Sequence, residues 1–138
     1  MIPIDPTRQL RKAYFDKINP IIPLHDGLAV ENSPMPYAII TMLPNENTNV
    51  KDQFFYEDVT VNIDIVSAYE GQKQCDEKAQ LILNELYSDI CTPSFTLDDF
   101  QVIGLKHSFI PINRLATKSG YISRKIISFK QNLKQKNG

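Results

Sequence analysis

The chain has 138 residues, of which 42% are hydrophobic and 22% are charged, enough for one domain with one core. Its formal net charge of -1 argues against a dedicated nucleic-acid binder, although DNA could still pass nearby without being gripped. No apolar run is long enough to span a bilayer, and the first residues lack the basic and apolar segments of a signal peptide. We therefore expect one domain over residues 1–138 and no membrane partner.

The first residues predict a helix. Asp5 suits the N-cap and Pro6 the first helical position. The helix should end at Asn19, because a residue that precedes a proline avoids the helical region. Its inward side chains would be Leu10, Ala13, Tyr14 and Ile18.

The segment that follows is rich in turn residues and prolines. We expect an extended stretch at 21–24, a turn at His25-Asp26-Gly27 and a short edge strand at 28–30. Residues 32–36 contain two prolines, which cannot donate to a strand ladder, so they predict a loop. Residues 37–43 predict the next strand.

Residues 44–52 are polar and carry little helix or strand signal. They predict a long connection, and connections of this length are usually functional or mobile. Phe54 and Phe55 follow at the mouth of a strand and would point to opposite faces, so one of them should face away from the core. An outward Phe would suit a partner contact, although it could equally pack under the loop or against the first helix. The candidate interface residues are Asn45, Asn47, Asn49, Lys51, Phe54, Phe55 and, near the C-terminus, Lys134 and Lys136.

Residues 56–90 hold the strongest pattern. Alternation over 59–65 predicts a half-buried strand, with Val and Ile on one face and Thr, Asn and Asp on the other. After Gly71 the period changes to three and four, which predicts an amphipathic helix. The helix and strand should bury their apolar sides together, with Val61, Ile63, Ile82, Leu83 and Leu86 in contact. The predicted helical stripe is Cys75, Ala79, Ile82, Leu83, Leu86, Tyr87 and Ile90.

The last third predicts two strands and two connections. Residues 92–99 form a turn-rich linker, and a strand at 102–110 places Ile103, Leu105, His107 and Phe109 on one face. Residues 113–120 are a polar connection. A final strand covers 121–133, and 134–138 read as a flexible tail. This order predicts an α+β domain with a mainly antiparallel or mixed sheet and two helices on one face.

No cluster of residues predicts catalysis or a cofactor. His25 and His107 lack partners at metal-ligand spacing, and each is better explained as a turn residue or an edge-of-core residue. The pairs Glu57-Asp58 and Asp98-Asp99 would need to meet to hold a metal, and solvated strand ends explain them better. Cys75 and Cys91 predict buried free thiols in a reducing compartment rather than a disulfide. We therefore expect no enzyme activity, no metal and no cofactor.

Several stretches resemble the tail terminator, or tail completion, proteins of long-tailed bacteriophages. The similarity rests on a leading helix, HDG, SPMPYAIIT, VTVNIDIVSAYEG, AQLILNELY and the closing RKIISFKQNL. In the close, the family pattern falls on Arg124, Ile126, Phe129, Gln131 and Leu133. These motifs are mainly patterns of apolar residues, and the resemblance covers nearly the whole chain.

The resemblance implies a structural virion protein. Family members form six-fold rings that cap the finished tail tube, stop its growth and present their other face to the head connector. The implied partners are other copies of the chain, the tail tube protein, the connector or stopper protein and DNA passing through the lumen. The implied location is the virion tail or neck, after assembly in the bacterial host cytoplasm.

Two other interpretations remain open. Another neck or head-completion protein could use a similar small α+β domain, since one fold hosts many functions. A small enzyme that uses His25 or His107 belongs to a different class and is disfavoured, because neither histidine has a visible partner.

Overall fold

The computed structural model describes residues 2–27, 33–43, 48–51, 53–68, 72–110, 115–117 and 120–136. Within these ranges the chain forms two helices and nine strands. The elements are α1 (Thr7–Ile18), β1 (Leu24–Asp26), β2 (Tyr37–Met42), β3 (Thr48–Lys51), β4 (Phe54–Ser67), α2 (Lys73–Leu86), β5 (Tyr87–Asp89), β6 (Thr92–Pro93), β7 (Phe100–Ile110), β8 (Leu115–Thr117) and β9 (Gly120–Gln135).

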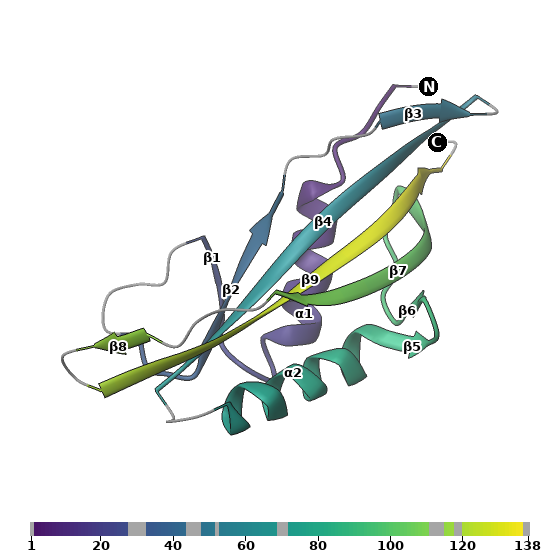
Figure 1. Ribbon diagram of the computed structural model, residues 1–138. Coiled ribbons are helices and arrows are strands. Elements are labelled where there is room, and N and C mark those ends of the chain that lie inside the picture. Colours follow the sequence, from purple (N-terminus) through teal and green to yellow (C-terminus); the bar gives the residue numbers. More distant parts are fainter. Residues whose placement is uncertain are drawn as a thin grey trace.

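Two long antiparallel strands, β4 and β9, form the centre of the main sheet (Figure 1). Their register runs without a shift from the pair Tyr56 and Lys134 to the pair Ser67 and Ser123. β2 and β3 pair with successive parts of β4, while β7 and β8 pair with successive parts of β9. Only β1 and β2 run parallel among the described strands. The predicted α+β class, with a mainly antiparallel sheet, is therefore confirmed.

Both helices lie on the same face of this sheet, which we call the inner face (Figure 1). Period-2 alternation supplies its apolar side chains, since every second residue of β4 from Val59 to Ile65 is buried. β9 contributes Ile127, Phe129 and Leu133, each 0% exposed. The predicted strand–helix unit is confirmed for Val61, Ile63, Ile82 and Leu86, whereas Leu83 is only partly buried.

The first helix ends at Ile18 with Asn19 as its C-cap, as predicted, whereas the second helix ends earlier than predicted. α1 begins at Thr7, and the Asp5 carboxylate accepts bonds from the Thr7 backbone N–H at 2.9 Å and hydroxyl at 2.6 Å. α2 ends at Leu86, because Tyr87 is already extended at φ -104 and ψ 136. Ile90 lies outside the helix in the turn between β5 and β6 and is 86% exposed, so its predicted place on the buried stripe was wrong.

Polar segments predicted as connections contain strands. Thr48–Lys51 forms β3, and Lys51 pairs with Phe54 across a tight turn in which Gln53 has φ 68. Leu115–Thr117 forms β8 against the start of β9. His25 and Asp26 belong to β1 rather than to a turn, and Gly27, which follows them, has φ 80. The edge strand expected at 28–30 lies outside the described residues.

The predicted flexible tail is wrong for residues 134–136. Gln135 ends β9 at 3% exposure, and its side chain bridges the N-terminal segment. It accepts a bond from the Ile4 backbone N–H at 2.9 Å and donates to the Ile2 carbonyl at 2.7 Å. The Lys136 N–H donates to the Asp99 carbonyl at 2.8 Å. These bonds join segments far apart in sequence; residues 137 and 138 lie outside the described part.

A bulge changes the predicted faces of β7. The register shifts between Val102 and Gly104, so Val102 packs against the core and Ile103 is 52% exposed. The prediction that Ile103 faces inward was therefore wrong. Beyond the bulge, Leu105 is 0% exposed, as expected.

Candidate interaction surfaces

The β3–β4 hairpin brings three of the predicted interface residues together. Lys51 and Phe54 are register partners and so share one sheet face. Lys134 on β9 holds its ammonium 4.2 Å from the centre of the Phe54 ring, a cation–π contact. By alternation this face is the one opposite the helices, which we call the outer face. The cluster Lys51–Phe54–Lys134 therefore forms a cationic and aromatic patch at this end of the sheet.

The remaining predicted residues lie apart from this patch. Phe55 pairs with Val50, which is 66% exposed, on the other face of the hairpin, and both phenylalanines are half-buried. The Lys136 ammonium donates to the Leu97 carbonyl at 3.1 Å, so it fastens the segment before β7. Asn49 lies in β3, while Asn45 and Asn47 lie outside the described residues.

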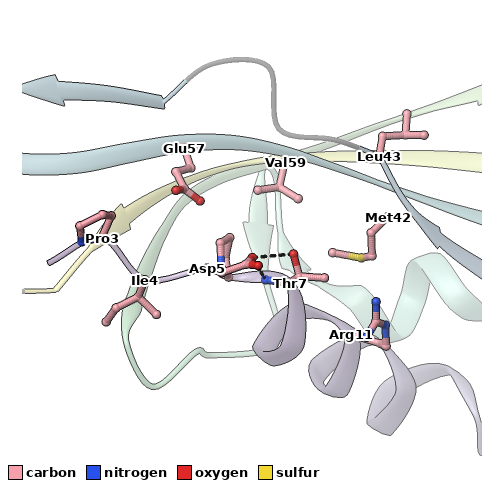
Figure 2. A pocket seen from close by; sticks show the side chains of 10 residues that line it. Pro3, Ile4, Asp5, Thr7, Arg11, Met42, Leu43, Glu57 and Val59 are labelled. Carbon is pink, nitrogen blue, oxygen red and sulfur yellow. Dashed lines mark hydrogen bonds between the residues drawn. The ribbon is translucent and has the colours of Figure 1, made fainter.

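A cavity of about 620 Å³ opens between the N-terminal segment, α1, β2 and β4 (Figure 2). Glu57 from β4 and Asp5 before α1 line one end, and Arg11 lines the other. Hydrogen bonds from the Thr7 side chain and backbone N–H lower the pKa of Asp5, which therefore stays ionised at the helix start. Glu57 is 8% exposed, so the prediction of a solvated strand end was wrong for it.

This cavity could not be found from sequence because it draws on segments far apart in the chain. Arg11 is drawn toward β1, where its Nε lies 3.3 Å from an Asp26 carboxylate oxygen. Gln9 on α1 donates to the Asp99 carboxylate at 2.6 Å, and Asn132 donates to the Asp58 carboxylate. The two predicted acidic pairs therefore make different contacts. No group of three or more His, Cys, Asp or Glu that could hold a metal occurs among the described residues.

Each histidine contacts an aromatic ring. The His107 Nδ1 lies 2.8 Å from the Tyr87 hydroxyl, and its ring packs near those of Phe109 and Phe129. Burial raises the pKa of Tyr87, which makes its hydroxyl a weaker acid. The His25 ring lies 5.5 Å from Tyr37. These contacts fit the edge-of-core interpretation of His107, and the absence of catalysis by either histidine stays a prediction.

The two cysteines are free thiols, as predicted, but only one is buried. Cys75 lies against the sheet, and burial raises its thiol pKa. Cys91 is exposed and has φ 52, in the turn between β5 and β6. The expectation that Cys91 is buried was therefore wrong.

The outer face of the sheet carries a hollow of about 830 Å³. Polar side chains line it together with Leu43, Ile103 and Ile110, each of which is at least 40% exposed. The polar residues come from β4, β7 and β9: Asp58, Thr60, Asn62, Lys106, Ser108, Ser128, Lys130 and Asn132. Alternation in the predicted strands identifies most of these as outward-facing, but their convergence requires the strand order and the β7 bulge.

Two pairs of polar side chains on the outer face bond to each other across β4 and β9. Arg124 on β9 makes an ion pair and two hydrogen bonds with Asp64 on β4. The hydrogen bonds that Arg124 donates to Asp64 raise the pKa of Arg124, whose charge is therefore firmly held. Asn132 donates to the Asp58 carboxylate. These contacts staple β4 to β9 on the side away from the helices.

Comparison with known proteins finds similarity among solved structures. No protein-family model matches the chain, and no curated protein matches it. A chain in the structure titled "Virion of native gene transfer agent (GTA) particle" has a similar fold, with a TM-score of 0.65. The alignment covers 96% of this chain and 99% of that one at 12% identity, so the likeness is one of fold. None of the described helices is long and apolar enough to cross a bilayer.

Proposed function

We propose that this chain is a structural virion protein that forms a homo-hexameric ring at the head-proximal end of a phage tail. The ring would end growth of the tail tube and join the tail to the head connector. The observation that carries this proposal is the fold shared, over nearly the whole of both chains, with a chain of a gene transfer agent virion. The resemblance of the sequence to tail terminator proteins supplies the more specific role.

The surfaces of the molecule support an assembly role more than a catalytic one. The polar groups on the outer face lie in an open hollow, and each histidine ring packs against at least one aromatic ring. A ring subunit needs surfaces for its neighbours, for the tail tube and for the connector. The hairpin patch, the hollow and the outer side of α2 are exposed surfaces that could serve these contacts. A near-neutral net charge of -1 also suits a ring through which DNA must slide.

The hairpin patch is our proposed contact with the tail tube or the connector. Phe54 is anchored on one side by Lys134 and remains half-buried in the free chain. The part of the Phe54 side chain that stays exposed in the free chain can be buried against a partner. Aromatic residues are enriched in interface cores. The patch lies at the end of the sheet where β3 projects beyond β2 (Figure 1).

Deletion of the gene from the phage that encodes it tests the role. If the chain is a tail terminator, the deletion should give tails of uncontrolled length that fail to join heads. Supplying the chain in trans should restore normal particles. Tails of normal, fixed length that remain separate from filled heads would instead assign the chain to another neck or head-completion position. Normal infectious particles would contradict both assignments.

A second experiment addresses the patch alone. Phe54→Ala combined with Lys134→Ala should leave a folded protein that supports joined particles poorly. Val50→Ala, a substitution at an exposed apolar residue on the other face of the same hairpin, is the matched control. If both variants give particles at the wild-type level, the patch is not the contact, although the ring could still form.

A further inference from the structure

The outer face of the sheet is positively charged, although the chain as a whole is slightly negative. Alternation places the even-numbered residues of β4 and β9, with their register partners, on this face. Among the described residues it carries five cations against two acids: Lys51, Lys106, Arg124, Lys130 and Lys134 against Asp58 and Asp64. The formal net charge of the chain is -1, so the excess of acids lies elsewhere. This separation of charge gives the outer face a positive field.

Two of these lysines stand directly opposite each other in the hollow. Lys106 on β7 and Lys130 on β9 are register partners, and both side chains are exposed. Directly opposite residues of antiparallel strands have Cβ atoms about 5 Å apart, and like charges at that spacing destabilise the pair. Neither lysine joins an ion pair with any described residue. An anion bound between them would remove the repulsion.

The two acids of this face are engaged by other side chains. The Asp58 carboxylate accepts a hydrogen bond from Asn132, and Asp64 forms an ion pair with Arg124. The residue of β4 that stands opposite Lys130 is the uncharged Thr60. The chain therefore leaves the charge of Lys106 and Lys130 to be neutralised from outside.

Hydroxyl groups lie beside the two lysines. The register places polar side chains in two adjacent rows across β4, β9 and β7, which we call the lysine rows: Thr60, Lys130 and Lys106 in one row and Asn62, Ser128 and Ser108 in the next. All six residues line the hollow. The three hydroxyls form no hydrogen bond with another described residue. Ammonium, hydroxyl and amide groups are the donors that proteins use to contact phosphate oxygens.

Gly104 keeps the surface open beside Lys106. It stands opposite Asn132, and nothing lies within 4 Å of the position that its Cβ would take. The hollow of about 830 Å³ extends over this position. A stiff ligand can therefore approach Lys106 from this side without meeting a side chain at position 104.

We propose that the lysine rows bind the phosphate backbone of double-stranded DNA. Lys106 and Lys130 would neutralise phosphates, and the three hydroxyls would donate to phosphate oxygens. The contact would be independent of sequence, because contacts to phosphate carry no sequence information directly. This contact rests on the proposed function, because DNA would meet the outer face where that face lines the lumen of the ring.

The composition of the hollow favours DNA over a protein partner. The cores of protein interfaces are depleted in lysine and enriched in aromatic residues, whereas the lysine rows contain two lysines and no aromatic side chain. The exposed isoleucines do not lie between the lysines, since Ile103 and Ile110 are seven residues apart on either side of Lys106. Duplex DNA carries about one charge per 1.7 Å of its axis, so it needs no matched arrangement of acids to meet both lysines.

Two lysines per chain predict a weak contact. Non-specific binding of DNA depends on the number of phosphates that are neutralised, and a protein held only by such contacts can slide along the duplex. Several copies arranged around one duplex would add their contacts together. A weak, sliding contact agrees with a chain whose net charge is -1.

The salt dependence of DNA binding tests this contact in the full chain. Binding to a fluorescent duplex is measured by anisotropy from about 50 to about 200 mM salt. Lys106→Gln with Lys130→Gln should weaken binding and make the slope of log K against log salt less steep by about 1.8, which is about 0.9 for each lost phosphate contact. Lys106→Arg with Lys130→Arg keeps both charges and should keep the slope.

The matched control makes the same change of net charge on the helices. Lys12 on α1 and Lys73 on α2 are both exposed. Lys12→Gln with Lys73→Gln should leave the slope unchanged. No measurable binding by the wild-type chain at the lowest salt, or an equal change of slope in the control, would overturn the proposal.

Photo-cross-linking locates the DNA on the molecule. Ser108→Cys, combined with Cys91→Ser to remove the exposed native thiol, is labelled with a photoactivatable azide. Irradiation in the presence of duplex DNA should link the chain to DNA. Gln80→Cys on the exposed side of α2, in the same background, is the control and should give no link above that of the unlabelled chain. Equal linking at the two positions would overturn the proposal.

The outcomes separate this contact from the ring itself. Tails of uncontrolled length after gene deletion, with DNA binding that does not depend on the two lysines, would support the ring and overturn the contact. DNA linked at position 108, with normal particles after gene deletion, would support the contact and contradict the ring. Binding of purified tail tube or connector protein that is lost with the two lysines, in a chain that binds no DNA, would give the hollow to a protein and overturn the proposal.

Discussion

The inner and outer faces of the sheet use the same strands and are completed in different ways. On the inner face, alternate apolar residues of β4 and β9 are buried under α1 and α2 of the same chain. On the outer face, Asp64 forms an ion pair with Arg124, and Asp58 accepts a hydrogen bond from Asn132. Lys106 and Lys130, by contrast, lie directly opposite each other on neighbouring strands. The difference teaches that the inner face is completed within the chain, whereas part of the outer face is left open to solvent.

The largest expected loss of stability comes from a substitution in the core of the inner face. Leu86→Ala should lower the free energy of unfolding by about 2–5 kcal/mol, because Leu86 is 0% exposed between α2 and the sheet. Leu81→Ala on the same helix removes the same atoms from a side chain that is 45% exposed. It should change stability by no more than about 0.5 kcal/mol. Chemical denaturation of both variants measures the contrast, and equal losses would show that the helix is oriented differently.

A smaller loss of stability is expected from the buried hydrogen bond between Tyr14 and Gln131 on the inner face. The buried Tyr14 hydroxyl donates to the Gln131 side-chain oxygen, and the Gln131 amide donates to the Val59 carbonyl. Tyr14→Phe leaves that oxygen without its donor and should cost about 1–3 kcal/mol. Denaturation at neutral pH measures this cost. An unchanged midpoint would mean that the bond contributes nothing to stability.

The same tyrosine gives a pH dependence. Burial raises the pKa of Tyr14 well above its ordinary value of 10.0, so the folded state favours the neutral phenol. This contribution is fully present below pH 10.0 and is lost as the pH rises toward the folded-state pKa. Wild-type protein should therefore lose more stability than Tyr14→Phe in alkaline solution. If the free energy of unfolding fell equally with rising pH in both proteins, the burial of this hydroxyl would be contradicted.

The outer face predicts opposite responses for its two kinds of cation. Arg124→Met leaves Asp64, whose side chain is 15% exposed, without its ion pair and should cost roughly 1–2 kcal/mol. Lys130→Gln relieves a like-charge pair and should leave the stability of the free chain within about 0.5 kcal/mol of wild type. Thermal melting of both variants at low salt makes the comparison. A large loss for Lys130→Gln would show that this lysine serves the fold.

The smallest expected effect is a difference in labelling between the two thiols. Without reductant, alkylation of the native protein should label the exposed Cys91 and spare the buried Cys75. Alkylation after denaturation should label both thiols. Intact-mass measurement distinguishes these outcomes, and no label after denaturation would indicate a disulfide.

The inner face could be predicted from sequence because its signals are local. The alternation over 59–65 and the change of period after Gly71 contain the strand and the helix directly. The helix was predicted too long because Ile90 continues the three–four spacing, whereas the backbone turns extended at Tyr87. A periodic pattern carries no information about where the backbone leaves the helix unless a capping residue marks it.

The outer face and the sheet edges depend on pairings that no local pattern contains. β3 is polar, and it becomes a strand because its backbone groups pair with β4. Gln135 read as part of a loose tail, yet its amide is held by Ile2 and Ile4 at the other end of the chain. The opposition of Lys106 and Lys130 likewise requires the β7–β9 register. The structure therefore brings only some of the predicted interface residues together. Lys51, Phe54 and Lys134 lie on one face, whereas Lys136 lies elsewhere.

The most direct test of the assembly role is an image of the intact particle. Cryo-electron microscopy of the phage neck should show this chain as a six-fold ring between the tail tube and the head connector. Density for this chain in another layer of the particle, or its absence from finished particles, would contradict the account.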